Sequence, residues 1–222
     1  MSDRTLQIEL GQEPVSLKEL AVQSIKKAIF DRKLKPENLY SDVAIAKTLG
    51  VSKTPVREAL IDLASRGLLV HEPRRGFRIR RLTEEDVCSL YDYREVLEVG
   101  VVSRLVPKIT LEGIEELEQI LLERRKTNTG TEQMRSIMAD RLFHLRLAEF
   151  CGNSFLLKAI QQVRDLCDVA GGLSLRTVGR KDEAQREHEA LFEMIKRRSI
   201  KGAREAMEEH LRSTCRRVLQ NL

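Results

Sequence analysis

Leu49-Gly50-Val51-Ser52-Lys53-Thr54-Pro55-Val56-Arg57-Glu58-Ala59-Leu60 is the stretch of sequence that decides the fold of the first domain. Gly50 is typical of a residue that ends a helix in the left-handed conformation. Thr54 followed by Pro55 is typical of a helix start, with Thr54 as the N-cap and proline at the first helical position. Two short helices joined by so tight a turn predict a helix-turn-helix.

The residues on either side extend this motif into a larger domain. Ser16-Leu17-Lys18-Glu19 has the form of a capping box and predicts a first helix, and Ser41 is placed to cap the short helix before the turn. Further on, Leu68–His71 and Phe77–Arg80 predict two strands with a turn between them. We therefore expect residues 1–81 to form an N-terminal winged helix-turn-helix, with three helices and a β-hairpin wing.

The positive charge of the chain is concentrated in this first domain. The 222 residues contain 39 Lys and Arg against 34 Asp and Glu, which gives a net charge of +5. Residues 1–81 hold 16 of the basic and 10 of the acidic residues, which is +6, and the remaining 141 residues hold 23 and 24, which is −1. A basic module joined to a neutral one is the asymmetry expected of a nucleic-acid reader attached to a second domain.

The second helix of the motif carries polar and basic residues near its start, namely Ser52, Lys53, Thr54 and Arg57. A recognition helix presents this end to the major groove of DNA. Arg74 and Arg75, in the turn of the wing, could reach phosphates or a minor groove. We therefore expect contacts with double-stranded DNA from these side chains. The wing and the basic charge argue against the alternative that the motif only packs a helical domain.

These residues resemble a known family. Leu39-Tyr40-Ser41-Asp42, the stretch from Leu49 to Leu60, Leu63 and Gly67-Leu68 are similar to the winged helix of the GntR superfamily of bacterial transcription regulators. The resemblance implies DNA contacts at Ser41, Lys53, Arg57 and the wing-tip Gly76. Family members commonly have arginine where this chain has Val43 and Lys53. Because lysine lacks the planar fork of arginine and valine loses the contact, we expect an operator that differs from those of better-known members.

The remaining residues, 82–222, carry helical patterns and no credible strand signal. Thr83-Glu84-Glu85-Asp86 resembles a second capping box, and Thr127-Asn128-Thr129-Gly130 is a polar break. The predicted helices run from this capping box to about Pro107, and then cover Leu111–Arg125, Thr131–Phe150, a helix from Ser154 that Gly171-Gly172 interrupts, Asp182–Arg198 and Gly202–Gln220. We therefore expect an antiparallel helical bundle and a mainly all-α chain.

Three histidines of this predicted bundle, His144, His188 and His210, lie on apolar helix faces. Asp140 precedes His144 by about one helical turn and so faces the same interior. A buried carboxylate is costly without a partner, and one carboxylate with three imidazoles forms a site suited to a divalent metal ion. The alternative is that the histidines are hydrogen-bonded core residues and that Asp140 pairs with His144 inside one helix.

The same positions resemble the metal-binding positions of the FCD domain, the FadR-like effector domain of this superfamily. They lie in Asp140-Arg141-Leu142-Phe143-His144, Glu187-His188 and Glu209-His210-Leu211, at spacings of 4, 44 and 22 residues. The resemblance implies a bound divalent ion (Zn, Ni or Mn) with two positions left for water or an effector carboxylate. It also implies effector contacts at Arg94 and Asn153. Arg94 could equally be a surface or packing arginine. For Asn153, a turn residue is the favoured interpretation over an effector contact.

These features together predict a homodimeric, DNA-binding transcription regulator. Its affinity for an inverted-repeat operator would respond to a small organic acid at the metal site, and repression is the commoner mode in the family. Two rival hypotheses are a regulator that responds to the metal itself and a metalloenzyme. A hydrolase needs a general base besides its metal ligands, and no motif supplies one, so we expect no enzymatic activity.

The composition also indicates the cellular compartment in which the protein acts. It has no run of 18 uncharged apolar residues, and its start, Met-Ser-Asp-Arg-Thr-Leu, lacks the apolar block of a signal peptide. We therefore expect a cytoplasmic protein with no membrane partner. Cys88, Cys151, Cys167 and Cys215 lie far apart with no C-x-x-C motif, and we expect them to be small buried residues in a reducing compartment.

Overall fold

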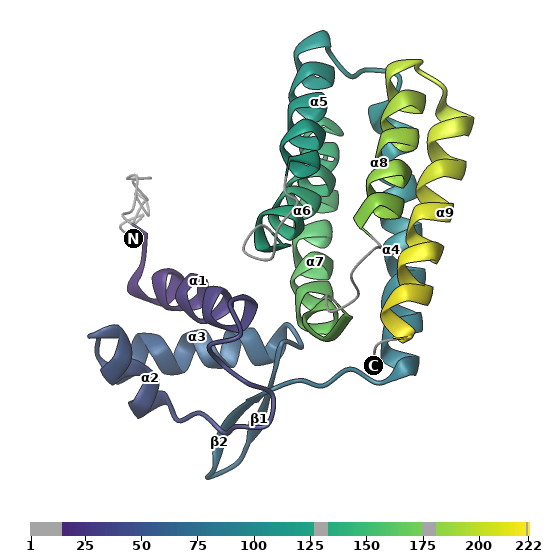
Figure 1. Ribbon diagram of the computed structural model, residues 1–222. Coiled ribbons are helices and arrows are strands. Elements are labelled where there is room, and N and C mark those ends of the chain that lie inside the picture. Colours follow the sequence, from purple (N-terminus) through teal and green to yellow (C-terminus); the bar gives the residue numbers. More distant parts are fainter. Residues whose placement is uncertain (1–14, 127–132, 175–180, 221) are drawn as a thin grey trace, which may run out of the picture. The chain divides into compact units, whose positions relative to one another are not determined.

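The computed structural model describes residues 15–126, 133–174, 181–220 and 222. The chain divides into two compact units, Met1–Arg80 and Arg81–Leu222. The first contains three helices and a two-stranded sheet, and the described part of the second contains helices only (Figure 1). The predicted fold class, a winged helix-turn-helix followed by a helical bundle, is confirmed.

The first unit is built on capped helices. Its elements are α1 Leu17–Phe30, α2 Asp42–Leu49, α3 Lys53–Ser65, β1 Leu69–Glu72 and β2 Gly76–Ile79. Ser16 and Glu19 form the predicted capping box, and the Ser41 hydroxyl accepts a hydrogen bond from the backbone N–H of Ala44 at 3.1 Å. Gly50 ends α2 with a φ of 68°, in the left-handed region, as predicted. Helices α1 and α3 pack against each other and bury Ile25 and Leu60.

The predicted start of α3 is wrong. Its N-cap is Ser52 rather than Thr54, so Pro55 lies within the first turn instead of at the first helical position. Proline is tolerated there because the first backbone amides of a helix have no acceptor inside the helix. The Ser52 side chain makes no capping hydrogen bond, which leaves its hydroxyl unused at the helix start.

The wing is an antiparallel hairpin whose register runs from Leu69 opposite Ile79 to Glu72 opposite Gly76. Tyr40, before α2, pairs with it: the N–H of Tyr40 donates to the Phe77 carbonyl at 2.8 Å, and the N–H of Phe77 donates to the Tyr40 carbonyl at 2.9 Å. Gly76 permits this approach, because its φ is 122° and a Cβ there would lie 2.5 Å from the Tyr40 carbonyl oxygen. The wing is therefore tied to the segment that leads into α2.

The described helices of the second unit are α4 Glu84–Leu105, α5 Leu111–Arg125, α6 Gln133–Phe150, α7 Ser154–Ser174, α8 Lys181–Lys196 and α9 Ile200–Leu219. Thr83 and Asp86 form the second predicted capping box. The expected interruption at Gly171-Gly172 is wrong, because α7 continues to Ser174. The predicted polar break at residues 127–130 lies outside the described residues.

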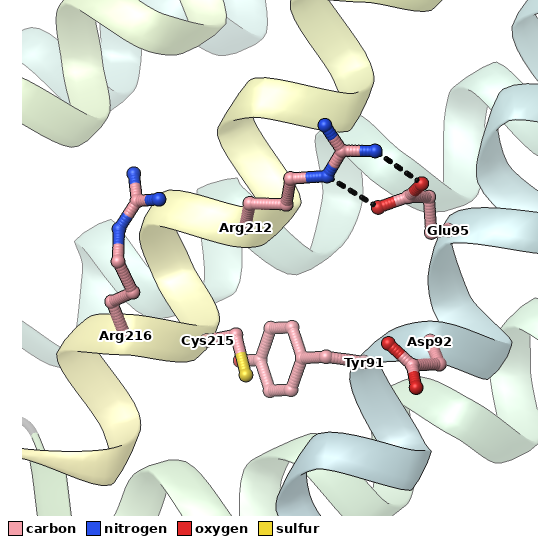
Figure 2. A pocket seen from close by; sticks show the side chains of 6 residues that line it. All are labelled: Tyr91, Asp92, Glu95, Arg212, Cys215 and Arg216. Atoms are coloured by element: carbon pink, nitrogen blue, oxygen red, sulfur yellow. Dashed lines mark hydrogen bonds and ion pairs between the residues drawn. The ribbon is translucent and has the colours of Figure 1, made fainter.

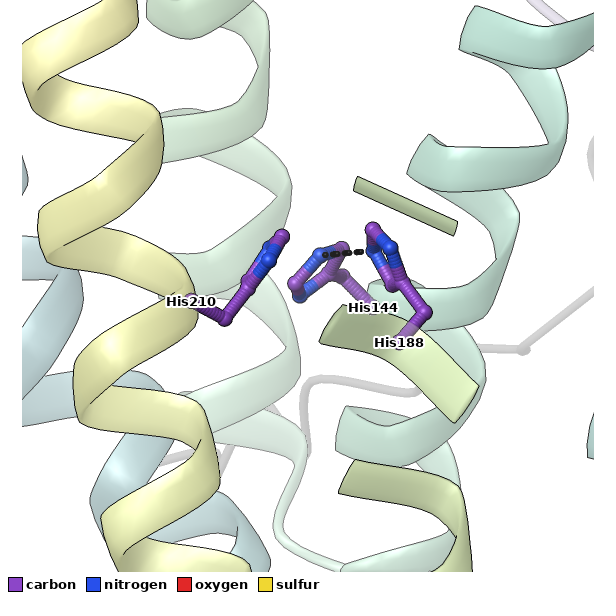
Figure 3. A group of neighbouring side chains, drawn as sticks. All are labelled: His144, His188 and His210. Carbon is purple, nitrogen blue, oxygen red and sulfur yellow. Dashed lines mark hydrogen bonds between the residues drawn. The ribbon is translucent and has the colours of Figure 1, made fainter. Parts of the chain in front are cut away.

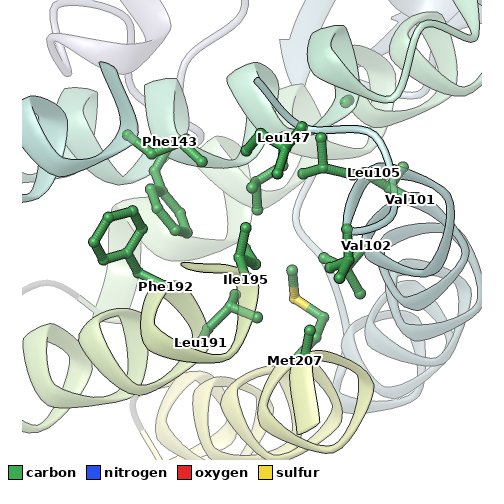
Figure 4. Packing of buried hydrophobic residues seen from close by; sticks show 14 of the residues in the cluster. Val101, Val102, Leu105, Phe143, Leu147, Leu191, Phe192, Ile195 and Met207 are labelled. Atoms are coloured by element: carbon green, nitrogen blue, oxygen red, sulfur yellow. The ribbon is translucent and has the colours of Figure 1, made fainter. Parts of the chain in front are cut away.

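Apolar side chains from α4, α6, α8 and α9 fill the interior of this bundle (Figure 4). The side chains that Figure 4 labels are Val101, Val102, Leu105, Phe143, Leu147, Leu191, Phe192, Ile195 and Met207. Each is buried, and fully burying a large apolar side chain stabilises a fold by about 1.5–3 kcal/mol. The histidine-bearing helices α6, α8 and α9 are therefore fixed by apolar packing on the same faces that carry the histidines.

Two further expectations concern apolar helices and cysteines. No helix in the described ranges is both long and apolar enough to cross a membrane. Cys151 and Cys167 are buried as predicted, but Cys88 is exposed and Cys215 is partly exposed, so the prediction for these two is wrong. Cys88 is exposed because the preceding residue, Val87, takes the inward position on α4 and is completely buried.

Candidate metal centre and nucleic-acid interface

Three histidines from three helices meet inside the second unit. His144 lies on α6, His188 on α8 and His210 on α9, and Figure 3 shows their rings turned toward one another. One ring nitrogen from each lies within 4.8 Å of the others. All three side chains are buried, at 1%, 0% and 3% exposure, respectively. The structure thus brings together three of the four predicted ligands as one group.

Each imidazole has its Nδ1 nitrogen occupied by an acceptor. His188 Nδ1 lies 2.5 Å from the Ala184 carbonyl, and His210 Nδ1 lies 2.9 Å from Glu187 Oε2. His144 Nδ1 contacts a Glu98 carboxylate oxygen. A carbonyl or ionised carboxylate oxygen can only accept, so Nδ1 carries the proton in each neutral ring and Nε2 keeps a lone pair. This is the arrangement by which proteins prepare histidines for metal binding.

Burial keeps two of these rings neutral. It is the largest influence on the pKa of His144 and lowers it to about 4, although Glu98 acts in the opposite direction. Burial, together with His188, also lowers the pKa of His210 to about 3, although the hydrogen bond to Glu187 opposes this. Both rings are therefore neutral near pH 7, and a neutral imidazole is the form that binds a metal ion.

Asp140 adjoins the group but is held partly by a cation. Its Oδ1 lies 3.1 Å from His188 Nε2, while its other oxygen contacts the Arg164 guanidinium from α7. Burial by itself would raise the pKa of this carboxyl, but Arg164 and His188 outweigh it and hold the pKa well below its usual range. The fourth predicted ligand is therefore an ionised carboxylate at the edge of the histidine group.

The potential ligand atoms at this centre lie close together. His188 Nε2 lies 3.3 Å from His144 Nε2 and 3.1 Å from Asp140 Oδ1. A neutral ring whose Nδ1 carries the proton offers its Nε2 nitrogen as a metal ligand, and the Asp140 carboxylate oxygen is a further potential ligand atom. Imidazole nitrogens and a carboxylate oxygen are ligands that divalent metal ions take, so the chemistry of the donor set fits a divalent metal ion.

Arg94 is not a surface residue. It lies on α4 with 1% exposure, and its Nε donates to Glu98 Oε1 at 2.8 Å. Its guanidinium carbon lies 4.9 Å from the centre of the Tyr91 ring. One buried nitrogen, Nη2, has no hydrogen-bond partner. Because Glu98 also contacts His144, Arg94 is linked to the histidine group through one carboxylate.

Asn153 has a different setting. It is exposed at the start of α7, and its side-chain oxygen accepts hydrogen bonds from the backbone N–H groups of Phe155 (3.0 Å) and Leu156 (3.1 Å). These bonds satisfy two amides of the helix start. The side chain therefore acts as a helix cap here, and its contact with an effector stays a prediction.

Sequence reasoning did not foresee the groups that support the histidines, namely Glu98, Arg164 and Glu187. Glu98 and Arg164 lie 46 and 20 residues from His144 in the chain, so no local pattern links them to it. A weak signal did exist for two of them, since Glu98 lies four residues after Arg94 and Glu187 directly precedes His188.

The basic residues at the start of α3 share one carboxylate. Lys53 Nζ lies 3.6 Å and Arg57 Nη1 3.8 Å from Asp42 Oδ2, on the first turn of α2. Both cations are exposed, as are Ser41, Ser52 and Thr54. Exposed pairs at such distances are weak, so these cations can exchange Asp42 for a phosphate or a base edge.

The wing presents two more exposed cations. Arg74 adopts a φ of 65° in the turn, and Arg75 Nη1 lies 3.0 Å from Glu72 Oε2. Gly76 has a backbone role, because it makes room for the Tyr40 carbonyl. Val43 is 57% exposed on α2, so this position is open to solvent.

Comparisons with known proteins agree with this architecture. A sequence profile described as "Bacterial regulatory proteins, gntR family" matches residues 17–79, and one described as "FCD domain" matches residues 89–213, which is more than half of the chain. The chain belongs to the GntR family. It combines the gntR winged helix with an FCD domain, as the sequence motifs predicted.

Relatives of this GntR-family chain are transcription regulators. The HTH-type regulator YdhC of Bacillus subtilis is 32% identical over 86% of this chain and 86% of its own length. The HTH-type transcriptional repressor RspR of Escherichia coli is 25% identical over 83% and 81%. In fold, the chain is similar to E. coli McbR/YncC, with a TM-score of 0.84, 23% identity, and 93% and 99% of the two chains covered.

The family therefore decides between classes of function. This GntR-family chain is a DNA-binding transcription regulator and not an enzyme, which removes the metalloenzyme hypothesis.

Proposed function

We propose that this regulator binds an inverted-repeat operator as a homodimer, as a repressor, and that a small carboxylate bound at a metal centre controls its operator affinity. Asp140, His144, His188 and His210 would hold the divalent ion. The observation that carries the proposal is the group of three buried histidine rings whose ligand nitrogens lie within 4.8 Å of one another beside an ionised carboxylate. A divalent ion supplies positive charge there, together with open coordination positions for an anion.

The chain's own residues would select an anionic effector. Arg94 is buried, and its Nη2 nitrogen has no hydrogen-bond partner. A guanidinium can bind a carboxylate through two parallel hydrogen bonds. Because Arg94 lies on α4 and the histidines on α6, α8 and α9, a carboxylate bound by both would link four helices. Such a ligand shifts the bundle toward the arrangement that it binds best.

The DNA half of the proposal places α3 in the major groove. Ser52, Lys53, Thr54 and Arg57 would face base edges and phosphates, Ser41 would bind a phosphate at the start of α2, and Arg74, Arg75 and Gly76 would follow the backbone beside the groove. The repressor mode is supported by a relative that is itself named a repressor, RspR.

The test measures operator affinity in four states of the protein. An operator is first selected from a random DNA pool. Its affinity is then compared for metal-loaded and chelated protein, each with and without a panel of small carboxylates, together with metal content and thermal shift. We expect one class of carboxylate to change operator affinity of the loaded protein only, and Arg94→Lys, which keeps the charge but lacks the fork, to lose this response.

Other outcomes would contradict the proposal. An operator affinity that tracks the metal with no carboxylate effect would make the ion itself the signal. A chelator that lowers only the melting temperature would make the ion structural. If no operator can be selected from the pool, the proposal that the protein binds an inverted-repeat operator is contradicted.

A further inference from the structure

Two cysteines lie on neighbouring helices of the second unit. Cys88 lies on α4 and Cys215 on α9, which run side by side (Figure 1). Cys215 packs against the buried cluster that contains Val87, the residue directly before Cys88, and Cys88 is close enough to raise the pKa of the Cys215 thiol. Cys88 is exposed and Cys215 is partly exposed, and neither belongs to a disulfide. Two thiols on helices that pack against each other can be joined when side-chain movements bring the sulfurs to the bonding distance of about 2.0 Å.

Packing on both sides fixes the helices at this pair. Val87 and Tyr91 of α4 and Val218 of α9 form a small buried cluster, and Cys215 packs against it. One turn farther along, Arg212 pairs with Glu95 through two nitrogens, at 2.9 and 3.1 Å. These contacts hold the two helices in register, so the thiols remain near each other.

A pocket gives small molecules access to this place. It has a volume of about 260 Å³, and Figure 2 shows Cys215 in its wall. The lining residues are Tyr91, Asp92, Glu95, Arg212, Cys215 and Arg216. Neither the proposed metal centre nor the proposed DNA contacts include any of these residues.

We propose that Cys88 and Cys215 are a redox-active thiol pair that a peroxide converts into a reversible intramolecular disulfide. The Cys88 thiolate attacks one peroxide oxygen, the O–O bond breaks, and a sulfenic acid and hydroxide are formed. Cys215 sulfur then attacks the Cys88 sulfur, and the hydroxyl leaves as water with the Cys215 proton. In sum, two thiols and one hydrogen peroxide give one disulfide and two waters, and the two sulfurs lose the two electrons that the peroxide gains.

The two cysteines have different parts in this reaction. Burial, the neighbouring Cys88 and Asp92 raise the pKa of Cys215 to about 11, so this residue stays a protonated thiol and is the resolving group. Cys88 has the greater exposure and is therefore the group that meets the oxidant first. The disulfide would join α4, which carries Arg94, to α9, which carries His210.

The remaining cysteines serve as internal controls. Cys151 is 1% exposed and Cys167 is 9% exposed. Burial raises the pKa of the Cys167 thiol, which disfavours its reactive thiolate form. Both should keep their thiols under mild oxidation.

The experiment treats the reduced full-length protein with hydrogen peroxide, blocks the remaining thiols by alkylation and digests with trypsin. We expect the peptides 82–94 and 213–216 to appear as one cross-linked species, two hydrogen atoms lighter than their sum. The loss should be two of the four thiols, and a dithiol reductant should restore both. The protein should remain monomeric on a denaturing gel without reductant.

Two variants decide the assignment. In Cys215→Ser, Cys88 should be trapped as a sulfenic acid that a dimedone probe labels, while Cys88→Ser should lose no thiol at the same peroxide concentration. Cross-links between chains, over-oxidation of Cys88 in the unmodified protein, or four intact thiols would each overturn the proposal.

Discussion

At the residue scale, His188 shows how one side chain is prepared for its task from within its own helix. The Ala184 carbonyl, four residues earlier, accepts the Nδ1 proton, so Nε2 faces His144 and Asp140. His144 and His210 depend instead on carboxylates from other positions, Glu98 on α4 and Glu187 on α8. Two of the three rings are thus oriented by groups that an isolated helix would not provide.

The supporting carboxylate of His210 offers a test of the metal assignment. Because Glu187 orients the ring and raises its basicity, Glu187→Gln should weaken metal affinity by about 10- to 100-fold. The matched control is Glu209→Gln, since Glu209 lies one residue before His210, but its side chain is 65% exposed and forms an ion pair with Arg216. Competition with a metal-sensitive dye measures both. Equal affinities in the two variants would remove Glu187 from the centre.

Arg57 carries the corresponding prediction for DNA. A side chain that reads a base through two hydrogen bonds contributes about 1–3 kcal/mol, so Arg57→Ala should weaken operator binding by roughly 5- to 150-fold. Arg66→Ala is the control, since Arg66 follows the other end of α3 and pairs with Asp62 at 2.7 Å. Fluorescence anisotropy with labelled operator measures both, and an unchanged affinity in the first variant would contradict its assignment.

At the element scale, the wing depends on a position where only glycine fits. The hairpin alone is two short strands, and such hairpins are only marginally stable in water. The two backbone hydrogen bonds between Tyr40 and Phe77 add the missing support. Gly76 lies at the point of closest approach, so this residue links the wing to the helix-turn-helix.

A pair of glycine variants separates the cost of backbone strain from the cost of a steric clash. Gly50→Ala should cost about 1–2 kcal/mol, because the left-handed φ is unfavourable for alanine but nothing lies within 4 Å of the new Cβ. Gly76→Ala should cost more. Its new Cβ would lie 2.5 Å from the Tyr40 carbonyl oxygen, which would have to move away. Urea unfolding of the first unit gives both free energies. The reverse order would show that the Tyr40 bridge contributes little.

The sequence predicts these elements well where local chemistry acts alone. The caps at Ser16, Ser41 and Thr83 and the helix end at Gly50 are local patterns, and all are present. The start of α3 was misplaced because Ser52 and Thr54 are both good N-caps, and a proline in the first turn fits either. Gly171-Gly172 does not stop α7, because each glycine costs a helix only about 1 kcal/mol relative to alanine.

For the candidate site, helical spacing was enough to place the three histidines on inward faces. It could not supply Glu98 or Arg164, because these reach the centre from α4 and α7 through tertiary packing. It also did not show that Asp140 would be shared between Arg164 and His188. Ligand types were therefore predictable from periodicity, whereas the supporting charges required the assembled bundle.

At the scale of the whole molecule, the two units differ in the interactions that stabilise their folded structures. The first unit has caps, a compact apolar core and a surplus of basic residues. The second surrounds a group of ionisable side chains with apolar packing. The candidate metal ligands lie entirely in the second unit, so a bound cation should stabilise that unit alone.

Chelation should therefore act on one of two unfolding transitions. A ligand that binds only the folded state at 100 times its dissociation constant adds about 2.7 kcal/mol of stability. We expect removal of the metal to lower the melting temperature of the second unit and to leave that of the first unchanged, as measured by differential scanning calorimetry. His188→Ala provides the control, because its transitions should not respond to the chelator. A shift in the first unit's transition would contradict the assignment of the site.

The burial of the three histidines also affects how fast a bound ion could be released. Their side chains are at most 3% exposed, so an ion bound by them would be released only when α6, α8 and α9 separate locally. Such openings are rare in a well-packed bundle, and the off-rate of the ion would be the rate of opening multiplied by the chance of escape. Under the proposed function, the ion would therefore be a long-lived part of the protein, and the faster exchange of the proposed carboxylate would carry the signal.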